Sequence, residues 1–209
     1  MCDVAEYQAL RAAGQSIVAM LNRGFADHPE AVADNLQAFL ASSNELKTLK
    51  TNTGQTITQP AVSVYCYRVS VDRETRPGWS AVGSMDGIPR LPIRMHLLLA
   101  AWAENAEAEL QWLGLAAQIL ESHPILTGVQ LLPIDQGGTP FSPWQPGDAV
   151  QLVTDDLALE SMSEAFQALT TEFRLTLPYI ARVICLEGPV EPGRERVALV
   201  AGRVDRIGT

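Results

Sequence analysis

The sequence predicts an α+β fold, in which a mixed β-sheet is flanked by an N-terminal helix and two further amphipathic helices. Three observations favour this class. Apolar residues recur at helical spacing in three separate stretches, other stretches carry strand patterns, and the two kinds do not alternate as in a doubly wound sheet. The 209 residues suffice for one sizeable core, so we expect a single domain over residues 1–209.

The N-terminal stretch predicts the first helix. Apolar residues recur at helical spacing from Val4 to Leu21, and Asp3 precedes them as a candidate N-cap. Residues 22–60 are weakly periodic and then become polar and turn-rich. They indicate a short helix or strand followed by a loop.

The middle of the chain predicts two strands and the second helix. "AVSVYCYRVSV" (Ala61–Val71) is apolar on both faces, which is typical of an internal strand. Leu91–Ala100 alternates with a period of two, so we expect a strand with one apolar face. Near Ala101 the period changes, and a helical stripe follows at Leu110, Leu113, Ala117 and Leu120.

The C-terminal half predicts further strands and the third helix. "GVQLLPI", "AVQLVTDDLAL" and "LPYIARVICLEG" are typical of strands, and residues 189–209 predict a C-terminal edge strand. Ser161 and Glu164 are spaced as a capping box before the apolar stripe of residues 162–173. The third helix is therefore expected over these residues.

Two long loops are candidate interfaces. Asp72–Arg90 and Asp135–Asp148 are rich in Gly and Pro, and long loops in compact domains are often functional. Trp is enriched among the residues that dominate protein interfaces. The candidate partner-interface residues are Arg76, Trp79, Phe141 and Trp144. The alternative is that the aromatic side chains fold back onto their own domain.

Charge and apolar patterning narrow the partners and the compartment. The formal net charge is −9, which argues against a nucleic acid or an anionic membrane as the main partner. No apolar run reaches the roughly 20 residues of a membrane span, and the N-terminus does not resemble a signal peptide. Cys66 and Cys185 lie in apolar runs and are expected to be small core residues of a protein in a reducing, cytoplasmic compartment.

The sequence contains no strong catalytic, cofactor or metal motif. Neither a G-x-G-x-x-G nor a P-loop pattern occurs, and His28 and His123 each precede a proline, where they are expected to cap helix carbonyls. His96 is the one candidate general base, with Asp155, Asp156 or Glu172 as partner. No nucleophile is expected beside it, so the preferred interpretation is a structural histidine, and no cofactor or metal is predicted.

Three arginines interrupt apolar strands: Arg68, Arg94 and Arg182. An arginine within a buried strand needs a partner carboxylate. Such residues lie either at subunit boundaries or with only their stems buried.

Four segments in order carry a family resemblance. They are "CYRV" at Cys66–Val69, "IRMHLLLAAWA" at Ile93–Ala103, "WLGLAAQILESHPILTG" at Trp112–Gly128, and "MSEAFQALTTEFRLTLPYIARVICLEG" at Met162–Gly188. Together the chain resembles the tail-terminator, or cap, family of contractile injection systems, with a Pvc16-like N-terminal domain. The resemblance is strongest over residues 61–188 and includes His96, Gly114, Gln118, His123 and Pro124. The chain departs from the family pattern in "RLTLPY" and at Leu97.

The resemblance implies a structural role. Family members form a ring, usually a hexamer, on the baseplate-distal end of tube and sheath, where they end polymerisation and link sheath to tube. The implied partners are further copies of the chain and the inner-tube and sheath proteins. The alternatives are the terminator of a true phage tail and a small cytosolic enzyme that uses His96.

Overall fold

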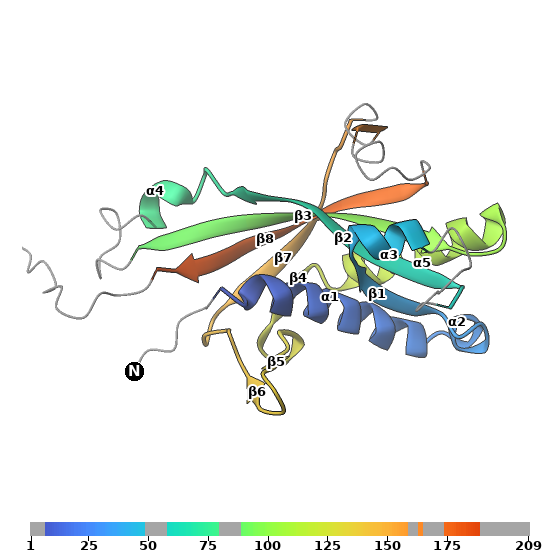
Figure 1. The fold of residues 1–209 in the computed structure, drawn as a ribbon, viewed down its shortest axis with the longest axis horizontal. Coiled ribbons are helices and arrows are strands. Elements are labelled where there is room, and N and C mark those ends of the chain that lie inside the picture. Colours follow the sequence, from blue (N-terminus) through green and yellow to red (C-terminus); the bar gives the residue numbers. More distant parts are fainter. Residues whose placement is uncertain (1–6, 49–57, 80–88, 159–162, 165–173, 189–209) are drawn as a thin grey trace, which may run out of the picture.

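The fold is built on one curled, mixed β-sheet. The computed structural model describes residues 7–48, 58–79, 89–158, 163–164 and 174–188. The sheet has six strands in the order β1-β2-β3-β8-β7-β4 (Figure 1). Their bounds are β1 (Gln37–Ala41), β2 (Ala61–Val71), β3 (Arg90–Trp102), β8 (Thr176–Glu187), β7 (Ala149–Thr154) and β4 (Ile125–Thr127). β1 pairs with β2 in parallel and the other pairs are antiparallel, so the predicted α+β class is confirmed.

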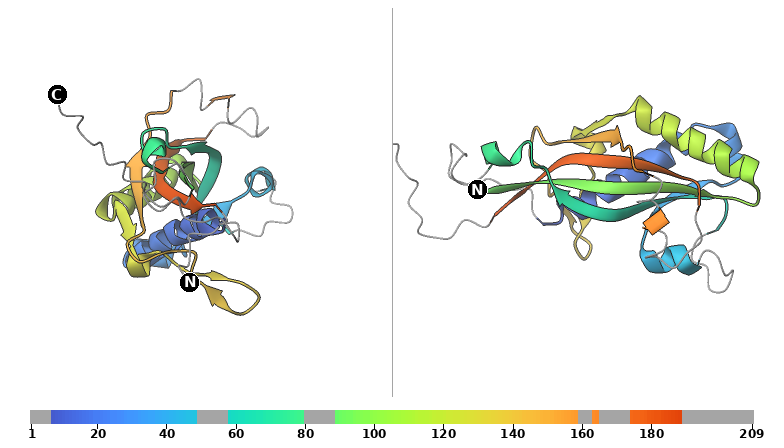
Figure 2. Two further views of the ribbon diagram at one scale, coloured as in Figure 1. Left: turned by 90° about the vertical axis from the view of Figure 1, so that its left-hand side faces the viewer. Right: turned by 90° about the horizontal axis from the view of Figure 1, so that it is seen from above.

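Two long helices cover one face of the sheet (Figures 1 and 2). α1 (Ala9–Ala26) and α5 (Ala106–Ser122) contribute to the same buried cluster as alternate residues of the central strands. Among these strand residues are Val62 and Val64 of β2 and Leu97 and Leu99 of β3. Alternate side chains of a strand point to opposite faces, so the residues between these belong to the other face.

Short elements complete the described chain. They are α2 (Pro29–Ala33), α3 (Ser43–Thr48), α4 (Arg76–Trp79), a 3-10 turn η1 (Gly128–Gln130), and a hairpin of β5 (Ile134–Asp135) and β6 (Pro140–Phe141). The helix predicted over residues 162–173 and the edge strand predicted over residues 189–209 lie outside the described residues. So does Asp3, the predicted N-cap.

Residues 22–60 hold more structure than the expected short element and loop. They include α2, β1 and α3. The side chain of Asn22 donates from Nδ2 to the Ala38 carbonyl at 3.0 Å, and its Oδ1 accepts from the Ala38 amide at 2.7 Å. One amide thus satisfies both backbone groups of a residue on the edge strand β1 and holds that strand against α1.

β3 is buried on both faces in its second half, so the prediction of a single apolar face was wrong there. Leu98, Ala100 and Trp102 are buried although they alternate with the residues facing α1 and α5. Trp102 belongs to a second apolar cluster with Ala41 and Leu46, the latter from α3. A short helix that the sequence pattern did not reveal therefore covers this end of the second face.

The predicted stripe of α5 was wrong in its phase. The buried residues are Trp112, Leu113, Ala116, Ile119 and Leu120. Leu113 and Leu120 are confirmed as core positions, whereas Leu110 is 58% exposed. The helix begins at Ala106, where the side chain of Asn105 accepts a hydrogen bond from the Ala108 amide, and Trp112 and Ala116 rather than Leu110 lie on the side that meets the core.

Two further sequence predictions are corrected. "GVQLLPI" is not one strand, because Gly128 adopts a φ of 52° and Thr127 and Gln130 form a reciprocal capping box around a 3-10 turn. Cys66 and Cys185 are partly exposed rather than core residues. Burial still raises the pKa of both thiols, that of Cys185 to about 12.

Candidate interface surfaces

The sheet curls until strands that are not neighbours touch across its second face. Tyr67 on β2 donates from its hydroxyl to Asp155 Oδ2 at 3.5 Å, although β3 and β8 lie between β2 and β7 in the sheet. The face opposite α1 and α5 is therefore concave, and we call its polar end the trough (Figure 2). The residues that define the trough are Tyr67, Ser70, Arg94, His96, Gln151, Asp155 and Arg182.

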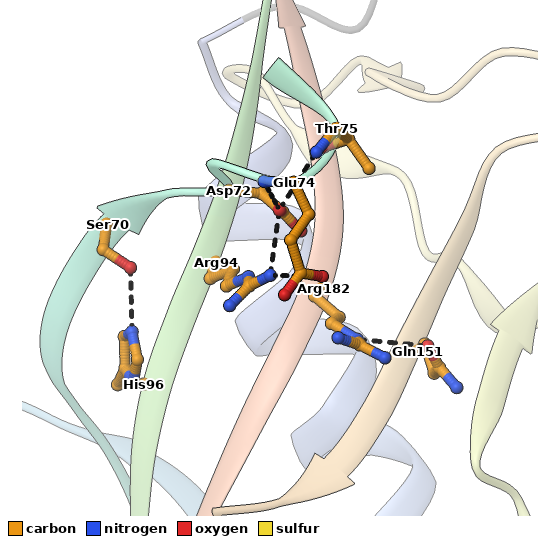
Figure 3. Close-up of polar contacts among 8 residues, drawn as sticks. All are labelled: Ser70, Asp72, Glu74, Thr75, Arg94, His96, Gln151 and Arg182. Atoms are coloured by element: carbon orange, nitrogen blue, oxygen red, sulfur yellow. Dashed lines mark hydrogen bonds and ion pairs between the residues drawn. The ribbon is translucent and has the colours of Figure 1, made fainter. Parts of the chain in front are cut away.

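His96 lies at the centre of a hydrogen-bonded chain in the trough. Its Nε2 lies 2.8 Å from Ser70 Oγ (Figure 3). Its Nδ1 lies 3.3 Å from Asp155 Oδ2. The structure thus brings Asp155 to His96 as one of the predicted partners, while Glu172 lies outside the described residues. The expectation that no nucleophile type accompanies His96 was wrong, because Ser70 does.

The position of Ser70 could not be read from the sequence. Arg68 is the residue that pairs with His96 across β2 and β3, and a bulge between Cys66 and Arg68 shifts the register. Ser70 reaches His96 diagonally, which is within range for neighbours on one face. A serine on one predicted strand and a histidine on another do not indicate a contact unless the register between the two strands is known.

The Ser70–His96–Asp155 chain has the connectivity of a hydrolytic triad but not its surroundings. A serine nucleophile normally lies at a sharp turn beside N–H groups that can stabilise an oxyanion. Ser70 instead lies within the ladder between β2 and β3, opposite Arg94. The arrangement is well suited to tie β2, β3 and the end of β7 together.

Arg94 has the buried carboxylate that its position requires. Asp72, only 1% exposed, accepts from Arg94 Nη2 at 2.9 Å and from the amides of Glu74 and Thr75 at 3.0 and 3.3 Å (Figure 3). Glu74 adds a second carboxylate to Arg94 at 3.2 Å. The hydrogen bond from Arg94 holds the pKa of Asp72 below its usual range. This network fixes the turn that leads into α4.

The other two strand arginines do not follow the predicted rule. Arg182 donates from Nε to the amide oxygen of Gln151 at 3.2 Å rather than to a carboxylate (Figure 3). Arg68 is exposed, so burial imposes no pairing on it. Arg94 and Arg182 are both half-buried, and of the two only Arg94 has a described carboxylate within reach.

Of the predicted interface residues in the first loop, Arg76 is exposed at one end of the sheet. Its Nη1 donates to the Arg90 carbonyl at 3.0 Å, which leaves most of the guanidinium donors facing outward. Trp79 is the last residue of α4, and its side chain lies outside the described parts of the structure. The segment therefore exposes a charged turn whose backbone is fixed by hydrogen bonds to Asp72.

In the second loop, Trp144 folds back onto its own domain. Its indole nitrogen donates to the Leu132 carbonyl at 3.0 Å, and its ring packs against the main core. Phe141 is half-buried on β6. The two loops lie on different sides of the molecule, with α4 at the upper left and β6 at the bottom of Figure 1.

The histidines predicted to cap helices behave differently from each other. His123 Nδ1 lies 3.5 Å from the Ile119 carbonyl, at the limit of a hydrogen bond, whereas His28 is the N-cap residue of α2 with no side-chain cap bond. Both line a cavity of about 250 Å³ between α1 and α5, together with Arg23 and Gln118. The prediction is thus supported for His123 only.

No metal or membrane feature is found in the described parts of the chain. Among residues whose placement is described, no three His, Cys, Asp or Glu side chains gather to hold a metal ion. The helices described there are too short or too polar to cross a membrane.

Comparison with known proteins identifies related structures. The Pvc16 N-terminal domain family matches residues 12–199. A cryo-EM structure of the sheath/tube terminator of an extracellular contractile injection system, PVC, in its extended state, is similar with a TM-score of 0.53 and 17% identity. The similarity covers 95% of this chain and 64% of that one, so the chain spans less than two thirds of the terminator.

A second structure is more distant. The tube-terminating cap of the anti-feeding prophage, also solved by cryo-EM, is similar with a TM-score of 0.40 and 16% identity over 67% of this chain and 47% of that one. At this TM-score it adds no support for the fold. Comparison with curated protein sequences finds no match.

Proposed function

The chain belongs to the Pvc16 N-terminal domain family, and from this premise we propose that it is a terminator that caps the tube and sheath of a contractile injection system. The single observation that carries the proposal is the family match over residues 12–199. It confirms the resemblance that the ordered sequence motifs predicted. The shared fold with a sheath/tube terminator supports the same role.

We further propose that several copies form a closed ring at the baseplate-distal end of the particle. A ring with the symmetry of a tube, such as a hexamer, needs two different surfaces on each copy that fit one another. The proposed partners are the inner-tube and sheath proteins, and the proposed location of the chain is the bacterial cytoplasm, as part of the assembling particle. Neither a nucleic acid nor a membrane is proposed as a partner, because the net charge is −9.

The two loops remain our proposed contacts with partners. Arg76 and Trp79 form one contact, and Phe141 and Trp144 form the other. Trp144 already has an internal hydrogen bond, so its replacement is expected to lower stability as well as binding. Arg76→Ala with Trp79→Ala is therefore the cleaner variant, and it should leave the monomer folded while reducing ring formation or docking.

A hydrolase is the second candidate function, and one observation favours it. Ser70 Oγ lies 2.8 Å from His96 Nε2, as a nucleophile lies beside its base. Ser70→Ala separates the two functions, because it removes the nucleophile and leaves His96 and Asp155 in place. A terminator keeps its capping activity in this variant. Loss of an ester-hydrolysing activity in a folded Ser70→Ala protein would instead support the enzyme.

The decisive experiment for the terminator is deletion of the chain from a producing strain, followed by electron microscopy of the particles. We expect particles of uncontrolled length or with detached sheath, and recovery when the wild-type chain is restored. A tag on the chain should appear at the end opposite the baseplate. Particles of normal length and sheath attachment in the deletion strain would refute the proposal, and so would a tag at the baseplate.

A further inference from the structure

The outer face of α5 carries an uncovered stripe of residues. Glu107, Leu110, Gly114 and Gln118 are all exposed, and their spacing of three, four and four places them on one side of the helix. Leu110 is 58% exposed on this face. The opposite side of the helix packs into the core through residues such as Leu113 and Leu120. We call the four exposed residues the α5 stripe.

Gly114 is not required by the fold of the chain itself. A Cβ added at Gly114 would meet no atom within 4 Å, whereas one added at Gly24 would lie 2.6 Å from Ile119 Cδ1. Glycine in a helix interior is less stable than alanine, by an amount that lowers the Tm of a chain of this size by about 2–4 °C. No contact within the described chain requires a glycine at this position. The absence of a side chain beside Leu110 would allow another molecule to approach the helix closely.

The charges of α5 indicate the chemistry of that molecule. The helix contains no Lys or Arg, and Glu104 and Glu107 are exposed at its N-terminal end. A partner must therefore bring basic groups. The surface formed by Gly114 and Leu110 beside these acidic residues favours a partner segment that is small enough to approach the helix closely.

An exposed pair of basic residues lies at the other end of the described part of the molecule. Arg73 and Arg76 are exposed in the turn and first residue of α4, followed by the small exposed Gly78. Glu74 in the same turn is engaged with Arg94 at 3.2 Å. α4 and the N-terminal end of α5 lie at opposite ends of the long axis in both Figure 1 and the right-hand view of Figure 2.

We propose that the α5 stripe is the docking surface for a second copy of this chain, which binds through its Arg73–Arg76 turn. Each copy then offers one acidic and one basic end. Such a head-to-tail contact uses two different surfaces, and it produces a closed ring when the rotation between copies closes. The proposal rests on the ring proposed above and specifies its subunit contact.

Charge reversal tests the contact. Glu104→Lys with Glu107→Lys, and separately Arg73→Glu with Arg76→Glu, should each weaken self-association by at least about tenfold, since like charges then face each other. The chain that carries all four changes should recover association, because the pairs are matched again. Asp156→Lys is the control for a charge reversal at an exposed residue that belongs to neither proposed surface, and it should leave association unchanged. Sedimentation velocity over a concentration series measures each effect.

Gly114→Ala tests the close approach independently of charge. It should raise the Tm of the monomer by about 2–4 °C and at the same time weaken association, a combination that a purely structural role would not produce. If the reversal variants and Gly114→Ala all form rings with wild-type affinity, the α5 contact is refuted, while the proposal that the chain forms a ring is unaffected. A wild-type chain that stays monomeric both alone and on purified tubes would overturn the ring and the contact together.

Discussion

The close packing of α1 on α5 makes Gly24 the most sensitive small residue in the described core. A Cβ at this position would lie 2.6, 2.7 and 2.9 Å from Cδ1, Cγ1 and Cγ2 of Ile119. Carbon atoms normally approach no closer than about 3.5 Å. Ile119 is buried and β-branched, so its side chain has little freedom to turn away. Gly24→Ala must therefore push the two helices apart or distort Ile119.

Two opposing effects set the magnitude of this change. Overpacking of a dense core costs about 1–3 kcal/mol, while alanine favours the helix over glycine by about 1 kcal/mol. The net loss in the free energy of unfolding should therefore be at most about 2 kcal/mol, which corresponds to a fall in Tm of up to about 8 °C. Gly114→Ala is the matched control, because the same substitution meets open space and should stabilise the monomer by about 0.5–1 kcal/mol.

Urea unfolding followed by circular dichroism, at concentrations where the chain is monomeric, measures both variants. A double-mutant cycle with Ile119→Ala locates the cause, since that change removes all three atoms that the new Cβ would meet. The two losses should then be less than additive by about 1–2 kcal/mol. A Gly24→Ala protein that is stabilised as much as Gly114→Ala would refute the reasoning and show that α1 and α5 are further apart than described.

Three other predictions follow from burial and charge. Leu120→Ala should lower the free energy of unfolding by about 2–5 kcal/mol, as measured by thermal or urea unfolding. Leu110→Ala, on the exposed side of the same helix, should change it by no more than about 0.5 kcal/mol. Equal losses would show that the buried face of α5 has been assigned wrongly. Asp72→Asn should cost about 1.5–3 kcal/mol, because it leaves the partly exposed Arg94 without its main partner. The lowered pKa of Asp72 means that this stabilisation is complete above the ordinary aspartate pKa of about 3.9 and is lost as pH falls through the lowered value, so the wild-type advantage over Asp72→Asn should vanish in acid melts. Cys185, with its pKa raised to about 12, should react slowly with iodoacetamide near pH 8 in the native protein and faster in urea. Rapid labelling of the native protein would show that the pKa of this partly exposed thiol is not raised.

Local patterns predicted the elements whose residue composition is uniform along their length. The strand at Ala61–Val71 has the bounds that its β-branched and aromatic run indicated, because both of its faces are apolar over much of that run. The family resemblance was likewise visible in ordered motifs and is confirmed by the family match. The α+β class followed from the order of the segments, which the sheet topology confirms.

Features that depend on tertiary geometry could not be predicted. The stripe of α5 was misassigned because apolar residues lie on more than one side of this helix, and tertiary packing decides which side meets the core. The second face of β3 is buried by α3, which comes from a segment without clear periodicity. Ser70, His96 and Asp155 meet only because a bulge shifts one strand and the sheet curls, and neither effect has a local sequence signal.

The central position of β3 has a mechanical consequence. Its thirteen residues pair with β2 on one side and β8 on the other over most of their length, and both pairings are antiparallel. Hydrogen bonds between antiparallel strands lie perpendicular to the strand axis. A pull along β3 therefore loads two rows of bonds in shear at the same time, rather than opening them one after another. If sheath and tube pull on opposite ends of this molecule during contraction, the long axis of the sheet is the direction in which it resists tension best.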